Sequence, residues 1–209
     1  MERIDESLLT AEEKANLDLL EITDGILTGV IDEEKLVGSL VIPDSVTVIA
    51  STAFADCTSL TSVIIPNSVT KIEWSAFSCC TSLTSVLIPD AVSEIGWEAF
   101  FGCTSLTRIV IPAHVTELGG RAFGSCTGLI HLSVDPANAI YYSENNIIYT
   151  KDKKTLLAAA TGLTGRIAIP NSVTVISADA FADCNSLTSV EIPNTSIKIK
   201  DRAFPVVPV

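Results

Sequence analysis

Residues 57–77 read CTSLTSVIIPNSVTKIEWSAF, and residues 80–100 read CTSLTSVLIPDAVSEIGWEAF, so nearly the same stretch returns at a step of 23 residues, from Cys57 to Cys80. A repeat with a fixed period of about 20 to 50 residues is typical of solenoids, in which each repeat forms one coil. Positions that stay constant are expected to fill the interior of such a stack. Positions that vary are expected to face solvent or a partner.

Two residue columns extend the period over most of the chain. A proline recurs at Pro43, Pro66, Pro89, Pro112, Pro170 and Pro193. An Ala-Phe pair recurs at Phe54, Phe77, Phe100, Phe123, Phe181 and Phe204. The sequence therefore predicts six Ala-Phe coils, with one enlarged coil interrupting them.

Within one coil, the spacing predicts a strand, a turn, a second short extended piece and a short helical turn. Leu60, Val63 and Ile65 follow an LxxLxL pattern, whose last positions alternate inward and outward as in a strand. Pro66 has no amide hydrogen and ends that strand. Because no coil can bury its own apolar residues, stacked coils must share one core, with a parallel sheet along one face and the helical turns opposite.

The pattern SLTSVxIPxxVTxIxxxAFxxC resembles the BspA-like leucine-rich repeat, over about residues 37–204. The resemblance implies an α/β leucine-rich-repeat solenoid, wound as a right-handed superhelix of 23-residue coils. It also implies a protein that binds other macromolecules, often at the surface of microbes that live with a host. Neither enzymatic activity nor a cofactor is implied.

The chain divides into an N-terminal cap and lead-in, residues 1–36, and a single solenoid domain, residues 37–209. Thr10 and Glu13 form a capping box, which predicts a helix over residues 11–21 that covers the open end of the core. The enlarged coil, residues 135–169, has no Ala-Phe pair, and NIIYT and TLLAAA flank KDK in it as in a hairpin. This coil is a spacer or, alternatively, a binding loop.

Composition excludes several classes of partner. Thirteen basic and 25 acidic residues give a net charge of −12, which repels nucleic acid and anionic membranes. No apolar run is long enough to cross a membrane, and no secretory signal begins the chain. The location stays open, because the resemblance favours the cell surface whereas the missing signal favours the cell interior.

Cysteine and histidine provide little chemistry. Cys57, Cys80, Cys103, Cys126 and Cys184 share one repeat position, which predicts buried, reduced, structural thiols and no metal site. His114 and His131 are the two histidines, and both fall at expected surface positions without a nucleophile to activate. The sequence therefore predicts a protein without catalytic, cofactor or metal residues.

The outward strand positions are the first candidate binding site. Val41, Ile64, Leu87 and Val110 occupy one outward column in successive coils and predict an aliphatic stripe on the sheet face. The alternative is that these side chains only stabilise the sheet by packing on one another.

Charged and aromatic residues extend this candidate site. Arg108 and His131 follow serines in the adjacent outward column, which predicts a partner with an apolar patch beside an acidic one. Trp74 and Trp97 share a variable position, so we expect two indoles one above the other, with Phe101 nearby. The alternative for these rings is that they cover a gap between coils.

These observations favour a non-enzymatic module for protein–protein interaction, and the resemblance implies a microbial adhesin or scaffold that binds a host or self protein. Carbohydrate binding through Trp74 and Trp97 is the second hypothesis. A structural spacer within a larger assembly is the third.

Overall fold

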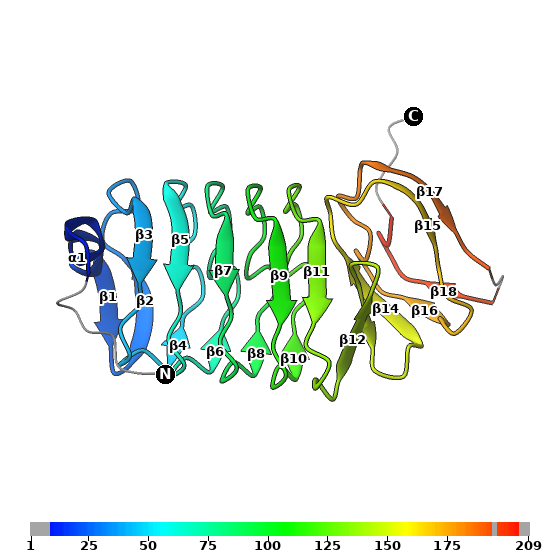
Figure 1. The fold of residues 1–209 in the computed structure, drawn as a ribbon, viewed down its shortest axis with the longest axis horizontal. Helices are drawn as coiled ribbons and strands as arrows, with labels where there is room; N and C mark the ends of the chain where they lie inside the picture. Colours follow the sequence, from blue (N-terminus) through cyan, green and yellow to red (C-terminus); the bar gives the residue numbers. More distant parts are fainter. Residues whose placement is uncertain (1–8, 194–195, 205–209) are drawn as a thin grey trace.

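The computed structural model describes residues 9–193 and 196–204 of the 209-residue chain. Strands from successive coils lie side by side along a solenoid, with a helix at the N-terminal end (Figure 1). The regular period of the sequence is therefore the period of a stack of coils.

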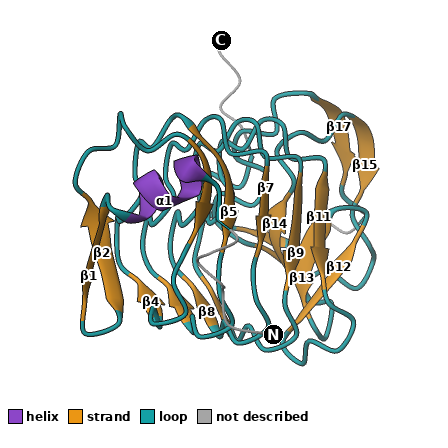
Figure 2. Ribbon diagram, turned by 60° about the vertical axis from the view of Figure 1, so that its left-hand side comes forward, coloured by secondary structure: helices purple, strands orange, loops and turns teal. Residues whose placement is uncertain are grey.

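The N-terminal cap combines a helix with a hairpin, and Figure 2 shows both at the same end of the solenoid. Helix α1 (Ala11–Leu17) begins at the predicted capping box, in which Thr10 Oγ1 accepts from the Glu13 amide at 3.1 Å and Glu13 accepts from the Thr10 amide at 2.9 Å. The predicted extension of the helix to residue 21 is wrong, because β1 (Leu20–Thr23) pairs antiparallel with β2 (Ile26–Val30). Asp24 and Gly25 between them both have positive φ, 51° and 77°, as a tight hairpin turn requires.

The predicted parallel sheet forms the front of the solenoid. Strands β3 (Gly38–Val41), β5 (Leu60–Ile64) and β7 (Ser85–Leu87) pair in parallel, with Val63 opposite Val86. Strands β9 (Arg108–Ile111) and β11 (His131–Val134) form a separate parallel pair. Although β7 and β9 are neighbours, no ladder joins them among the described residues.

A second parallel sheet forms the back of the solenoid. It contains β4 (Val48–Ile49), β6 (Lys71–Ile72), β8 (Glu94–Ile95) and β10 (Glu117–Leu118), which extend the β1–β2 hairpin into one sheet. The second residue of β4, β6 and β8 is buried. The second extended piece predicted in each coil is therefore a strand of a sheet, which two residues per coil are too few to indicate.

The side of each coil that was expected to hold a short helical turn is built from tight turns. Ala53 donates to the Ala50 carbonyl at 3.2 Å and Cys57 to the Phe54 carbonyl at 3.2 Å, which closes two four-residue β-turns. Thr52 and Asp56, the third residues of these turns, have positive φ, 59° and 60°, which a right-handed helix does not allow.

The invariant columns fill the core as predicted. Ring centroids of Phe54 and Phe77 are 4.9 Å apart, those of Phe77 and Phe100 5.1 Å, and those of Phe100 and Phe123 5.9 Å. Beside this column, the buried Cys80 thiol donates to the Phe54 carbonyl of the preceding coil at 3.1 Å. Each coil thus places one ring and one thiol on its neighbour.

The enlarged coil divides the molecule into two stacks. It folds as an antiparallel meander of β12 (Tyr141–Glu144), β13 (Ile147–Thr150) and β14 (Thr155–Ala159), so the predicted hairpin over residues 146–160 is confirmed. Strand β14 then pairs in parallel with β16 (Val175–Ile176), which pairs with β18 (Lys198–Ile199). On the front, β15 (Gly165–Ala168) pairs with β17 (Leu187–Glu191).

Two hydrophobic cores result from this division. One core contains the four stacked rings from Phe54 to Phe123, and the other contains Phe181 with Phe204 packed against it at 5.3 Å. Tyr141 closes the first stack, because its hydroxyl accepts from the Leu118 amide and donates to the Thr116 carbonyl, both at 3.1 Å.

Alkaline pH is expected to destabilise the fold through the thiol column. Burial raises the pKa of Cys57, and likewise that of Cys184, from an ordinary value near 9 to about 12. Because the folded-state pKa is the higher one, the stabilisation is complete below about pH 9 and is lost as the pH rises toward about 12. In this window, each thiol lowers the free energy of unfolding by about 1.4 kcal/mol per pH unit.

Urea unfolding from about pH 8 to about pH 11 measures this loss. The Cys57→Ala variant lacks one of the titrating groups, so its stability should fall less steeply with pH than that of the unchanged protein. Equal slopes for the two proteins would contradict the assignment.

Candidate binding surface

The outward column of the front sheet is only partly exposed. Leu87 is 74% exposed and Ile64 48%, whereas Val110 is half-buried. The strand register places Ile64 directly opposite Leu87. These two side chains therefore form a continuous apolar patch across β5 and β7.

The prediction that Val41 belongs to this exposed stripe is wrong, because Val41 is only 5% exposed. It lies on β3, the strand to which the cap helix is fixed. The Asn16 side chain donates to the carbonyls of Val37 and Ser39, both at 2.7 Å, and Glu12 accepts from the Ser39 amide at 3.2 Å. The stripe therefore begins at Ile64, beyond the contact of helix and sheet.

A hollow of about 280 Å³ lies where the front sheet is interrupted, between β7 and β9. Val86, which occupies an inward column, is only half-buried there, in contrast to the buried Val63 and Ile109 of the neighbouring strands. Strand β7, which has no ladder to β9, packs on the core only through a half-buried Val86 and presents Leu87 to solvent. The residues that line the hollow are Ser85, Val86, Leu87, Ile88, Asp90, Arg108, Val110, Pro112 and Asp135.

Charged side chains border this hollow. Arg108 and His131 are both exposed and lie opposite each other in the register of β9 and β11, so the predicted polar end of the surface is present. Arg108 forms no ion pair with any residue that the structure describes. Asp90 and Asp135 also line the hollow, although the sequence analysis did not identify them. The sequence could have indicated both aspartates, because each lies next to a proline, Pro89 or Pro136, and such prolines end the strands.

Trp74 and Trp97 are 51% and 49% exposed at equivalent positions of successive coils, as predicted. The expectation of stacked indoles is wrong, because the described rings of these two residues make no contact with each other. Instead, the Trp97 ring covers the next coil at Gly120, where a Cβ atom would lie 3.5 Å from Trp97 Cζ3. Glycine at this position leaves the space into which the ring leans.

Phe101 does not extend the tryptophan patch. Its ring is half-buried, and the Arg121 guanidinium lies 4.8 Å from its centroid. A shallow hollow of about 350 Å³ does adjoin Trp97, where Glu94, Thr116 and Glu117 supply polar groups beside the indole.

The two histidines and the potential metal ligands are scattered over the described residues. His114 and His131 are exposed, and neither imidazole makes a hydrogen bond within the described part of the chain. No group of three or more potential metal ligands occurs in residues 9–193 and 196–204. Over the same residues, no helix is long and apolar enough to cross a membrane.

Comparison with known families matches residues 33–149 and 160–206 to six copies of the BspA type leucine rich repeat region. The chain belongs to the BspA-type leucine-rich-repeat family. The match covers most of the chain and omits residues 150–159, which include the whole of β14 in the enlarged coil. The fold of this BspA-type protein and the predicted resemblance are therefore confirmed.

Solved bacterial structures have the same architecture as this BspA-type protein. A leucine-rich repeat protein from Eubacterium ventriosum is 25% identical, with a TM-score of 0.69, over 88% of this chain and 59% of that chain. One from Bacteroides ovatus is 27% identical, with a TM-score of 0.56, over 86% of this chain and 55% of that chain. The BspA-type chain thus spans little more than half the length of these two neighbours. A comparison with curated proteins finds no match.

Proposed function

We propose that this protein is a non-enzymatic module for protein–protein interaction, which binds its partner at the front sheet around Leu87. The exposure of Leu87 carries the proposal, because a leucine on a half-buried sheet surface gains about 1.5–3 kcal/mol when a partner covers it. Ile64 lies opposite it and enlarges the apolar contact. The repeat family, whose members generally bind proteins, supports this class of function.

The hollow beside Leu87 favours a partner segment that inserts one apolar side chain. Val110 and Val86 supply apolar walls for that side chain, and the unpaired Arg108 beside them suits a carboxylate next to it. The apolar anchor supplies affinity, whereas the charges around it select the partner and fix its orientation.

A role at the surface of a microbe, as an adhesin or scaffold for a host or self protein, is part of this proposal. The repeat family suggests an interaction or surface module, and the two structural neighbours described above are bacterial proteins.

Selection of peptides from a random displayed library on the full chain tests the proposal. We expect the selected peptides to share an apolar residue beside an acidic one, and Ile64→Glu with Leu87→Glu to weaken their binding at least about 100-fold. Thr47→Glu with Thr70→Glu, at two exposed positions beside the back sheet, is the matched control and should leave binding unchanged.

Equal loss in both double variants, or no loss in either, would exclude the front sheet. A glycan array provides the second outcome. Sugar binding that Trp97→Ala abolishes, with no peptide selected, would replace the proposal by carbohydrate recognition in the hollow beside Trp97.

A further inference from the structure

The turns of neighbouring coils are joined by a regular ladder of backbone hydrogen bonds. In each regular coil, three amides donate to three carbonyls of the next coil. Phe100 donates to Ala122 at 2.8 Å, and on either side of it Glu98 donates to Gly120 and Gly102 to Gly124. The same three positions make the same bonds in the two preceding coils.

This ladder is incomplete at the end of the first stack. The equivalent donors of the next coil are the amides of Arg121, Phe123 and Ser125. Only the Ser125 amide has an acceptor, the Asp183 carboxylate at 3.0 Å. The Arg121 and Phe123 amides have no acceptor within residues 9–193 and 196–204. Phe123 is buried, and a buried amide without a partner is rare in proteins.

The enlarged coil leaves these donors unpaired because it has no Ala-Phe turn. Ala159 donates to the Ala180 carbonyl at 2.8 Å, which is the bond that phenylalanine makes in the regular coils. Ala159 therefore stands where the ring column would place a phenylalanine, between Phe123 and Phe181. One ring of the column is missing at this point.

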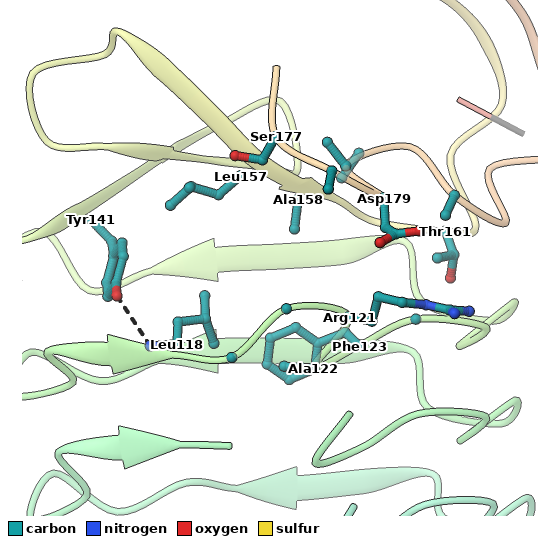
Figure 3. Close-up of a pocket in the computed structure, with 17 residues that line it drawn as sticks. Leu118, Arg121, Ala122, Phe123, Tyr141, Leu157, Ala158, Thr161, Ser177 and Asp179 are labelled. Atoms are coloured by element: carbon teal, nitrogen blue, oxygen red, sulfur yellow. Dashed lines mark hydrogen bonds between the residues drawn. The ribbon is translucent and has the colours of Figure 1, made fainter. Parts of the chain in front are cut away.

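A cavity of about 190 Å³ occupies the gap (Figure 3). The labelled side chains of Leu118, Phe123, Tyr141 and Leu157 line it from both stacks, and small residues such as Ala158 and Ala178 leave it open. Ala178 and Gly120 are exposed, so the cavity connects to solvent. For comparison, an apolar cavity of about 150 Å³ is large enough to bind benzene.

The far wall of the cavity supplies unpaired acceptors. The carbonyls of Ala178 and Ala182 correspond to those that accept from the preceding coil elsewhere, but no described residue donates to them. The Nε atom of Arg121 is also buried and without a partner in the described part of the chain. Donors on one wall and acceptors on the other match the two sides of a peptide unit.

The charges around the cavity are already paired. Arg121 lies 3.4 Å from Asp183 and 3.8 Å from Glu98, and Arg202 lies 3.3 Å from Asp179. A charged ligand would have to separate these pairs, whereas a neutral one would not.

We propose that this cavity binds a peptide segment through an uncharged aromatic residue, whose ring stacks on Phe123 in the missing place of the ring column. Carbonyls of the segment accept from the Arg121 and Phe123 amides, one for each amide as in the regular coils, and an amide of the segment donates to the carbonyl of Ala178 or Ala182. The segment thus completes both the ladder and the column. The site lies apart from Leu87, so it goes beyond the function proposed above.

Titration of the full chain with N-acetyl-L-phenylalaninamide tests the proposal by nuclear magnetic resonance. We expect the amide resonances of Arg121 and Phe123 to shift on binding. N-acetyl-L-alaninamide, which lacks the ring, should bind at least about tenfold more weakly than the phenylalanine amide. Toluene, which has the ring without the amides, should also bind about tenfold more weakly than the aromatic amide.

A variant that closes the cavity completes the test. Gly120 shares the column of Trp74 and Trp97, and the Trp97 ring leans toward the next coil, so Gly120→Trp should place an indole over the mouth. We expect this variant to lose at least about tenfold in affinity for the aromatic amide. Ser51→Trp, in the same column of the first coil, is the matched control and should bind normally.

Three results would overturn the proposal. Resonances of Arg121 and Phe123 that do not move would show that water alone fills the cavity. Equal affinity for the alanine amide would exclude the ring site, and equal affinity for toluene would exclude a peptide in favour of any small aromatic molecule. Because Ile64→Glu with Leu87→Glu leaves this site intact, failure here and failure of the front-sheet proposal are distinguishable.

Discussion

Replacing Phe77 by alanine is expected to lower the free energy of unfolding by about 3–5 kcal/mol. The ring is fully buried and is stacked on both sides, at 4.9 Å from Phe54 and 5.1 Å from Phe100. Its removal therefore leaves a cavity between two coils and takes away both ring contacts. Rings of other coils cannot close the gap, because the backbone ladder fixes the spacing between coils.

Chemical denaturation followed by circular dichroism measures this effect. Phe101→Ala is the matched control, since it removes the same side chain from a half-buried position where the ring faces the Arg121 guanidinium and stacks on no other ring among the described residues. We expect the control to cost about 1 kcal/mol or less. Similar losses in the two variants would show that the ring column does not form the core.

Replacing Asn138 by alanine is expected to lower the free energy of unfolding by about 3–4 kcal/mol, because four hydrogen bonds to the backbone, three of them buried, are lost at about 1 kcal/mol each. The Asn138 side chain is fully buried. Its Nδ2 atom donates to the carbonyls of Pro112 and Val115 at 2.8 and 3.0 Å, and its Oδ1 atom accepts from the amides of Ile140 and Tyr141, both at 2.8 Å. One side chain thus attaches the enlarged coil to the last regular coil.

Thermal and urea denaturation measure the loss. Asn171→Ala, at an exposed position of another coil, is the control and should change stability by less than about 0.5 kcal/mol. Asn138→Asp keeps the oxygen that accepts from the Ile140 and Tyr141 amides but loses the nitrogen that donates to the Pro112 and Val115 carbonyls, so this variant should also be less stable. An Asn138→Ala variant as stable as the control would contradict the role of this side chain.

The sequence predicted the regular coils well, because each inward position is repeated and every copy must satisfy the same packing. The phenylalanine and cysteine columns and the front strands follow directly from the 23-residue period. The back sheet was not predicted, since two residues per strand carry no periodicity of their own. The end of α1 was misplaced because the Asp24–Gly25 hairpin, a tertiary feature of the cap, overrides the helical pattern of the residues before it.

The candidate site was predicted only in its outline. Ile64 and Leu87 are exposed as expected, since alternation along a strand decides which side chains point outward. Val41 lies on the strand that Asn16 of the cap helix, far away in the sequence, binds through two hydrogen bonds, and the missing ladder between β7 and β9 depends on how two coils meet. The cavity beside Phe123 was not predicted either, because the enlarged coil lacks the Ala-Phe turn and the absence of a turn is not a motif that a sequence shows.

The division into two cores has a consequence for how such a chain can grow. The buried apolar residues on either side of the meander form separate cores, and polar bonds such as that of Ser125 to Asp183 link the two stacks only at the junction, so a duplication inside one stack changes its length without disturbing the core of the other. The meander therefore acts as a junction between two arrays that can lengthen independently during evolution.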